Sequence, residues 1–172
     1  QGAPDRNYIL MRLDGQASEG AYSTIYHEYT HLLTSRLPEA LPVWLSEGLA
    51  EFYETTDISG HEADLGKPSP ELIQLLRQRQ LMPLAQMFAV DDNSPYYHEQ
   101  DKASIFYAEA WALTHMIMIG DEQHHTRRLP DYLDRLRGGM SAVAAAAAAF
   151  GPLPALQQQL SEYIRHRSFT YF

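Results

Sequence analysis

The sequence predicts an α+β protein that is predominantly helical and carries a small β element. Apolar residues recur at helical spacing through most of the chain, and proline, serine and glycine stand where helices begin and end. Only "NYILMRLD", residues 7–14, has the β-rich apolar character of a longer strand. With 172 residues and 45% hydrophobic content, the chain is expected to form a single domain with a sizeable core.

The first helix is expected from about Ala21 to Arg36, after the turn-forming segment "GQASEG". Ile25, Leu32 and Leu33 recur on one face at helical spacing. Pro38 follows and cannot continue the helix, so the helix is expected to end before it.

A second helix, "VWLSEGLAEFYE", is expected to open at Pro42. Gly48 lies in its middle, where glycine costs about 1 kcal/mol relative to alanine. We therefore expect this glycine to allow close packing against another element. A turn at Ser59-Gly60 is expected between two short extended segments.

The rest of the chain is predicted to be mostly helical, with Ser69 as a cap and Pro70 at the first position of the third helix. Residues 90–101 read as a polar loop, and Gly120 is expected to close the longest helix. The expected helical segments are 69–80, one turn at 83–88, then 102–120, 129–139, 141–150 and 153–169.

Composition excludes several kinds of protein. The net charge of −9 argues against binding to nucleic acid or to an anionic membrane surface. No apolar run is long enough to cross a bilayer. The chain has no cysteine, which excludes a disulfide scaffold, a thiol nucleophile and a zinc–thiolate site.

The strongest chemical signal is "HEYTH", with His27, Glu28 and His31 on the first predicted helix. Residues four apart lie on one face of a helix, so both imidazoles can point at one Zn²⁺ ion. Glu28 would then lie beside the metal-bound water and could act as its general base. The alternative is a helix that carries two histidines by coincidence, a match expected roughly once in forty such sequences.

A third zinc ligand is expected from the second helix, where Glu47 and Glu51 are one turn apart. One of these carboxylates could bind the metal while the other accepts a hydrogen bond from a ligand histidine. The spacing alone does not show which of the two is the metal ligand and which is the hydrogen-bond acceptor. Two carboxylates that are simply solvated are the alternative.

An oxyanion donor is expected on the long helix, where Tyr107, Trp111 and His115 share a face. Tyr107 is the first candidate and His115 the second, and a stripe that only packs into the core is the alternative. Loop residues Tyr96, Tyr97 and His98 could cover one edge of the cleft or be simple loop aromatics. The other histidines are His61, a minor candidate ligand, and His124, His125 and His166, which are expected to be solvated.

"HEYTH" followed by "LPVWLSEGLAEF" resembles the gluzincin zinc metallopeptidases. The segment "WLSEGLAEF" is similar to the "WLNEGFA" stretch of the aminopeptidase branch. This resemblance implies that Glu47, directly before a glycine, is the metal ligand and that Glu51 is the supporting carboxylate. The spacing from His31 to Glu47 is shorter than in well-studied gluzincins, so the connecting loop must be tight. The glycine-rich exopeptidase motif of the aminopeptidases is not found in this sequence.

A closer resemblance is to bacterial "peptidase MA-like" domains, carried also by "FYAEAWALTHMI", "LPDYLDRLRGGMSAVAAAAAAFG" and "LQQQLSEYIRHRSF". It covers most of residues 7–170 and implies a zincin-like core over a single catalytic domain, 1–172, excised from a longer chain. It further implies one Zn²⁺ ion, a peptide or protein substrate and export to the periplasm, envelope or extracellular space. The rival hypothesis is a non-catalytic, zinc-containing module that binds a peptide or protein within a larger envelope or repeat protein. Glu28 distinguishes the two hypotheses, because a structural zinc site does not need a general base. A structural zinc ion also usually has four protein ligands.

Overall fold

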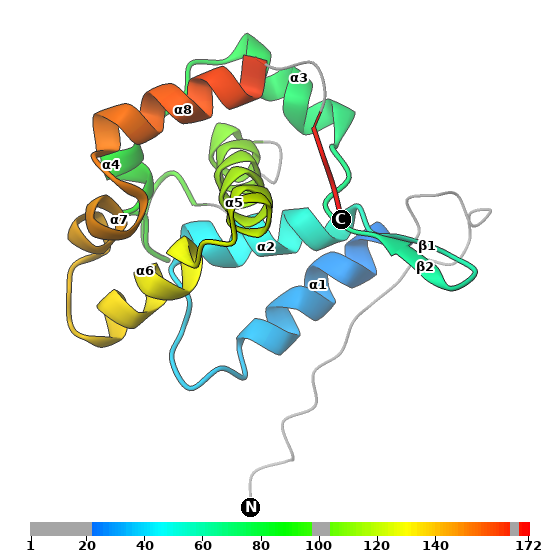
Figure 1. Cartoon of the computed structure of the whole chain (residues 1–172), viewed down its shortest axis with the longest axis horizontal. Coiled ribbons are helices and arrows are strands. Elements are labelled where there is room, and N and C mark those ends of the chain that lie inside the picture. The colour runs from blue at the N-terminus through cyan, green and yellow to red at the C-terminus, as the bar shows by residue number, and fades with distance from the viewer. Residues whose placement is uncertain (1–21, 98–103, 166–168) are drawn as a thin grey trace, which may run out of the picture.

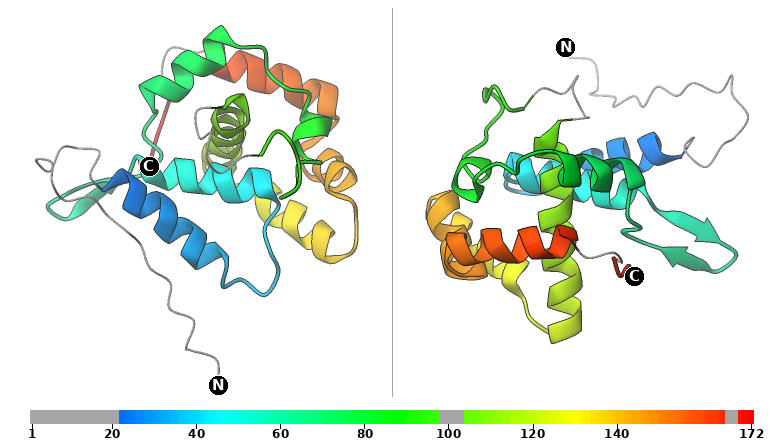
Figure 2. Two further views of the ribbon diagram at one scale, coloured as in Figure 1. Left: turned by 180° about the vertical axis from the view of Figure 1, so that it is seen from behind. Right: turned by 90° about the horizontal axis from the view of Figure 1, so that it is seen from above.

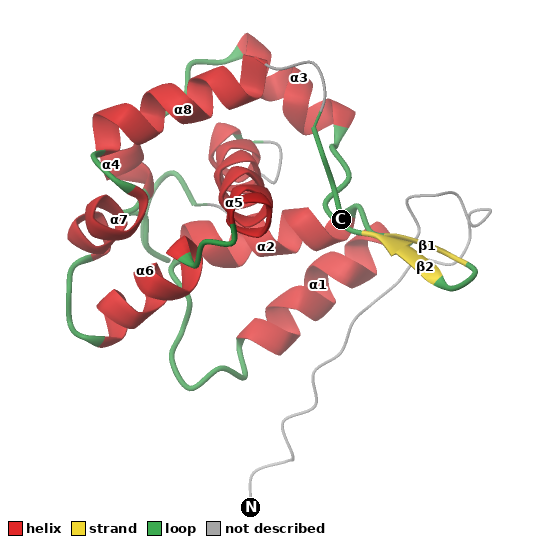
Figure 3. Cartoon of the chain, viewed as in Figure 1, coloured by secondary structure: helices red, strands yellow, loops and turns green. Residues whose placement is uncertain are grey.

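A computed structural model describes residues 22–97, 104–165 and 169–172. These residues form a predominantly helical structure with one two-stranded sheet, as Figures 1 and 3 show. The predicted predominance of helices with a small β element is therefore confirmed. The predicted strand at 7–14 lies outside the described residues.

The first two helices carry the candidate metal ligands His27, His31 and Glu47 and lie side by side (Figure 1). Helix α1 spans Ser23–Thr34 and α2 spans Val43–Glu54, close to the predicted bounds. The short connection between them, residues 35–42, contains Pro38 and ends at Pro42, whose φ of −54° suits the start of α2. The tight connection expected from the short motif spacing is thus present.

Helix α5, Ile105–His124, runs through the middle of the molecule and is buried along most of its length. Gly120 does not end it, contrary to the prediction. A Cβ at Gly120 would lie 2.6 Å from Nη2 of Arg128, so this glycine leaves room for a guanidinium group. The helix ends instead at His125, which takes the left-handed conformation with φ of 52°.

The remaining helices surround α5, as the two views in Figure 2 show. Ser69 caps α3 by accepting a hydrogen bond from the Leu72 amide, as its sequence position predicts. Trp44 of α2 packs in the core, and its Nε1 donates a hydrogen bond to the Tyr132 hydroxyl at 3.1 Å. The bounds of these helices are α3 Pro70–Gln78, α4 Leu84–Met87, α6 Arg128–Arg137, α7 Ala142–Phe150 and α8 Leu153–Arg165.

The sheet is an antiparallel hairpin of β1, Asp57–Ser59, and β2, Glu62–Asp64 (Figure 2). Its turn is Gly60-His61, one residue later than predicted, because Ser59 pairs with Glu62. Gly60 has a φ of +62°, which glycine adopts without steric cost at the first position of such a turn.

Gly48 sets how closely α2 approaches α5. A Cβ at this position would lie 2.5 Å from the carbonyl oxygen of Ala110, and the predicted close packing is confirmed. A different face of α2 carries carboxylates at helical spacing, at Glu47, Glu51 and Glu54, and all three lie within reach of His27 on α1. Helix α2 is thus held between the core and helix α1.

Within the described residues, no helix combines the length and the apolar character that a membrane span requires.

Candidate metal centre

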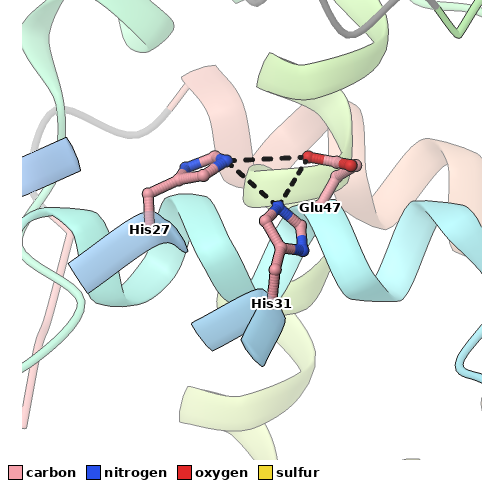
Figure 4. Close-up of side chains that lie close together, drawn as sticks. All are labelled: His27, His31 and Glu47. Atoms are coloured by element: carbon pink, nitrogen blue, oxygen red, sulfur yellow. Dashed lines mark hydrogen bonds and ion pairs between the residues drawn. The ribbon is translucent and has the colours of Figure 1, made fainter. Parts of the chain in front are cut away.

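Three side chains from α1 and α2 converge at one point (Figure 4). Nε2 of His27 lies 3.2 Å from Nε2 of His31, and Oε2 of Glu47 lies 3.8 Å and 3.5 Å from these two nitrogens. Two ligands of a tetrahedral zinc ion, each bonded at 2.0–2.1 Å, are roughly 3.3 Å apart. The spacing of the three atoms fits a metal ion.

The two histidines are oriented by hydrogen bonds at their other ring nitrogens. Nδ1 of His27 lies 2.9 Å from Oε2 of Glu54, and Nδ1 of His31 lies 3.2 Å from the Ser46 hydroxyl. A carboxylate only accepts, so Nδ1 of His27 donates and its Nε2 keeps a lone pair in the neutral ring. A ligand histidine typically donates its other ring N–H to a carboxylate in this way, so the pairing of His27 with Glu54 fits a metal site.

Glu54 makes the hydrogen bond that was expected of Glu51. Oε1 of Glu51 is 3.9 Å from Nδ1 of His27, beyond hydrogen-bond distance, while Glu54 is one turn further along α2 and closer. The expected role of Glu51 is corrected accordingly. His27, Glu51 and Glu54 also lie close enough together to hold a cation, but that group contains only one histidine of the motif.

The three side chains open onto a cleft of about 500 Å³, a typical volume for a ligand-binding site. His27 and Glu47 are almost fully buried, with 1% and 4% of their surface exposed, whereas His31 is partly exposed on the cleft wall. Glu28, which follows His27 in α1, also lines the cleft. The site therefore has a buried ligand set with one accessible side.

Two tyrosines, from α5 and from the loop before it, also line the cleft. Tyr107, the first candidate for the oxyanion donor, is on α5 and lines the cleft. Its side chain is almost fully buried. Tyr97 is in the loop before α5, and its hydroxyl donates a hydrogen bond to Oε1 of Glu47 at 3.0 Å. Of the loop aromatics expected at the cleft edge, Tyr97 lines it, Tyr96 is exposed and is not among the lining residues, and His98 lies outside the described residues.

The structure places His115 away from the cleft, so its candidacy as an oxyanion donor is wrong. Nδ1 of His115 lies 2.6 Å from the Tyr163 hydroxyl, and Nε2 lies 2.9 Å from the carbonyl oxygen of Gly66. Burial lowers the pKa of His115 to about 4, which keeps the ring neutral in the core. Trp111 packs against it, as the alternative interpretation of this stripe had expected.

The other histidines do not join the site. His61 is exposed in the hairpin turn, and His124 and His125 are exposed at the end of α5. His166 lies outside the described residues.

Comparison with known families gives one match. A family model described as "Protein of unknown function (DUF1570)" matches residues 21–135. These residues contain α1, α2 and α5, and hence every residue of the candidate metal centre. Comparisons with curated proteins and with solved structures found no match.

Proposed function

This chain belongs to the DUF1570 family, and we propose that it is a zinc metallopeptidase that hydrolyses peptide bonds. The observation that carries the proposal is the convergence of His27, His31 and Glu47 on one point of an open cleft that Glu28 also lines. The sequence resemblance to gluzincins supports the same conclusion. We further propose that the helical core is zincin-like.

In this proposal His27, His31 and Glu47 hold one zinc ion. When bound, the ion would lower the pKa of a water molecule and polarise the scissile carbonyl. Glu28 accepts the proton of the attacking water as general base. It then returns that proton to the amine nitrogen as the carbon–nitrogen bond breaks. Tyr107 donates a hydrogen bond to the oxyanion that forms on the carbonyl oxygen.

The surroundings of the ligands support catalysis over a purely structural zinc site. Structural zinc usually has four protein ligands. In the part of the chain that the structure describes, the cluster of His27, His31 and Glu47 offers three ligand atoms and faces a cleft. A fourth position open to water is the arrangement that hydrolysis requires.

Zinc content and hydrolysis of a fluorescent casein substrate test the proposal together. The purified protein is expected to bind close to one zinc ion per chain and to lose activity with a chelator. Glu28→Gln should keep the zinc and lower the rate by about 10²–10⁴-fold, the usual contribution of a general base. Glu62→Gln, which makes the same change on the exposed hairpin, serves as the control.

A protein without near-stoichiometric zinc would refute the metal site. Unchanged cleavage by Glu28→Gln would remove Glu28 from the mechanism. Zinc bound without hydrolysis of any substrate would favour the non-catalytic binding module. Glu47→Ala should lower zinc affinity far more than Glu51→Ala, and the reverse order would make Glu51 the metal ligand instead of Glu47.

A further inference from the structure

The loop before α5 holds one more carboxylate at the cleft. Two turns shape this loop: the Ser94 amide donates to the carbonyl of Asp91, and the Tyr97 amide donates to the carbonyl of Ser94. The described part of the loop, residues 91–97, is held by buried Val90 before it and by the hydrogen bond from Tyr97 to Glu47. Asp92 is the second residue of the first turn and lines the cleft.

The charge balance of the cleft singles out Asp92. The charged residues among its described lining are Glu28, Glu47 and Asp92, and none of the described lining residues is lysine or arginine. A Zn²⁺ ion bound by two neutral histidines would balance the two negative charges of Glu28 and Glu47. The charge of Asp92 is then left over, on a wall of the cleft built from a different segment than the zinc ligands.

We propose that Asp92 determines substrate specificity by binding a cationic group of the peptide. The proposal rests on the proposed peptidase function and names its substrate class, peptides with a positive charge near the scissile bond. The cation could be an arginine or lysine side chain or the free α-amino group, since each would pair with a carboxylate. The apolar side chains of Leu41 and Val43, which line the same cleft, would contact the uncharged part of the substrate.

Asp92 is exposed, so the preference is expected to be moderate. Ion pairs of this kind change affinity by up to about 5-fold at a surface, and a partly enclosed cleft can raise this to roughly 10-fold. Because salt screens such pairs, the preference should shrink as the sodium chloride concentration rises from about 0.05 M to 0.5 M.

The test uses a neutral peptide, acetylated and amidated at its ends, in which arginine is moved through every position. Citrulline, which has the shape of arginine without its charge, replaces it in the matched set. A third set has free amino termini and no basic side chain. Cleavage by the zinc-loaded protein gives kcat/KM, and fluorescence anisotropy with the Glu28→Gln variant gives binding without turnover.

We expect about 10-fold preference for arginine over citrulline at one position near the cleaved bond, or the same preference for the free amino terminus over the acetylated one. The two outcomes distinguish the side chain from the α-amino group as the source of the cation. Asp92→Asn should abolish the preference and Asp92→Lys should reverse it. Asp91→Asn is the matched control, because Asp91 is the adjacent residue, does not line the cleft, and as asparagine keeps the oxygen that accepts from the Asn93 amide.

Cleavage with equal kcat/KM for charged and uncharged peptides would overturn the role of Asp92 and leave the peptidase function standing. A preference that survives in Asp92→Asn would also overturn it. A charge preference in binding without cleavage of any peptide would support Asp92 and refute the hydrolytic function. Neither binding nor cleavage would refute both.

Discussion

The hydroxyl of Tyr97 donates a hydrogen bond to Oε1 of Glu47 at 3.0 Å, which leaves Oε2 of the same carboxylate facing the two histidines. Tyr97 therefore holds Glu47 in the orientation of a ligand that binds through one oxygen. Removing the hydroxyl frees the carboxylate to rotate, and groups in this position typically contribute 10- to 100-fold to metal affinity.

We predict that Tyr97→Phe lowers zinc affinity by about 10-fold, measured by competition with a chromophoric chelator. Tyr96→Phe is the matched control, since it removes the same hydroxyl from the neighbouring, exposed residue. Equal affinities for the two variants would show that Tyr97 does not orient the ligand. The stability of Tyr97→Phe should be checked by thermal unfolding, because the ring also packs near Tyr107 and Phe106.

Glu54 provides a second test of how the ligands are held. Its carboxylate accepts a hydrogen bond from Nδ1 of His27 at 2.9 Å, which favours the tautomer whose Nε2 could bind a metal ion. We predict that Glu54→Ala lowers zinc affinity by 10- to 100-fold. Glu54→Gln should recover part of the loss, because its amide oxygen can still accept the hydrogen bond.

A loss shared by Glu62→Ala, on the exposed hairpin, would show that the effect is one of net charge and not of this hydrogen bond. If Glu51→Ala weakens zinc binding more than Glu54→Ala, the supporting carboxylate is Glu51 despite its longer distance from His27.

His27 and His31 could be predicted from local spacing, whereas spacing left Glu47 and Glu51 as alternatives and the family resemblance favoured Glu47. His27 and His31 share a helix face by spacing alone, and a short proline-bounded connection brings Glu47 back against them. Tyr97 could be named only as an aromatic near the cleft, because its contact with Glu47 joins residues 50 positions apart. Glu54 was missed because the spacing of carboxylates on α2 does not reveal which of them the His27 ring meets.

The failed predictions have the same physical origin. Helix α5 is buried on nearly all sides, so periodicity could group Tyr107 with His115 but could not show that His115 faces Tyr163 and Gly66. Gly120 looked like a helix end, since glycine usually marks one. Its actual role depends on Arg128, which approaches it in the folded structure. Helix bounds that depend on tertiary contacts are not encoded in the local pattern.

Gly48 tests the packing that positions α2. In an isolated helix, Gly→Ala would stabilise by about 1 kcal/mol. Here a Cβ would lie 2.5 Å from the backbone oxygen of Ala110, which cannot move without shifting α5. We predict that Gly48→Ala lowers the free energy of unfolding by about 1–3 kcal/mol, measured in urea. It should also weaken zinc binding, since a displaced α2 moves Glu47.

Gly120→Ala is the matched control for Gly48→Ala. The atom that its Cβ would meet is the far end of the flexible Arg128 side chain, which can move aside. We therefore expect a smaller loss of stability than at Gly48. A Gly48→Ala protein at least as stable as the original would contradict the close approach of α2 and α5.

Glu109 makes stability depend on pH. Its side chain is fully buried on α5, and Oε2 accepts a hydrogen bond from the Met82 amide at 2.8 Å. Burial raises the pKa of Glu109 from 4.5 to about 7, so the folded protein holds a proton that the unfolded chain releases. The resulting stabilisation is complete below pH 4.5 and is lost as the pH rises to about 7. It amounts to roughly 3 kcal/mol at most.

His115 acts in the opposite direction, because burial lowers its pKa from 6.5 to about 4. Its contribution is present above pH 6.5 and is lost as the pH falls toward 4. The two slopes oppose each other between pH 4.5 and 6.5, so the wild-type profile alone does not isolate Glu109.

We therefore predict the difference in unfolding free energy between the original protein and Glu109→Gln. It should fall by up to roughly 3 kcal/mol between pH 4.5 and 7.5 and stay constant above that range. Glu122→Gln, an exposed substitution on the same helix, should give a profile parallel to the original. A parallel profile for Glu109→Gln would mean that folding does not raise the pKa of Glu109.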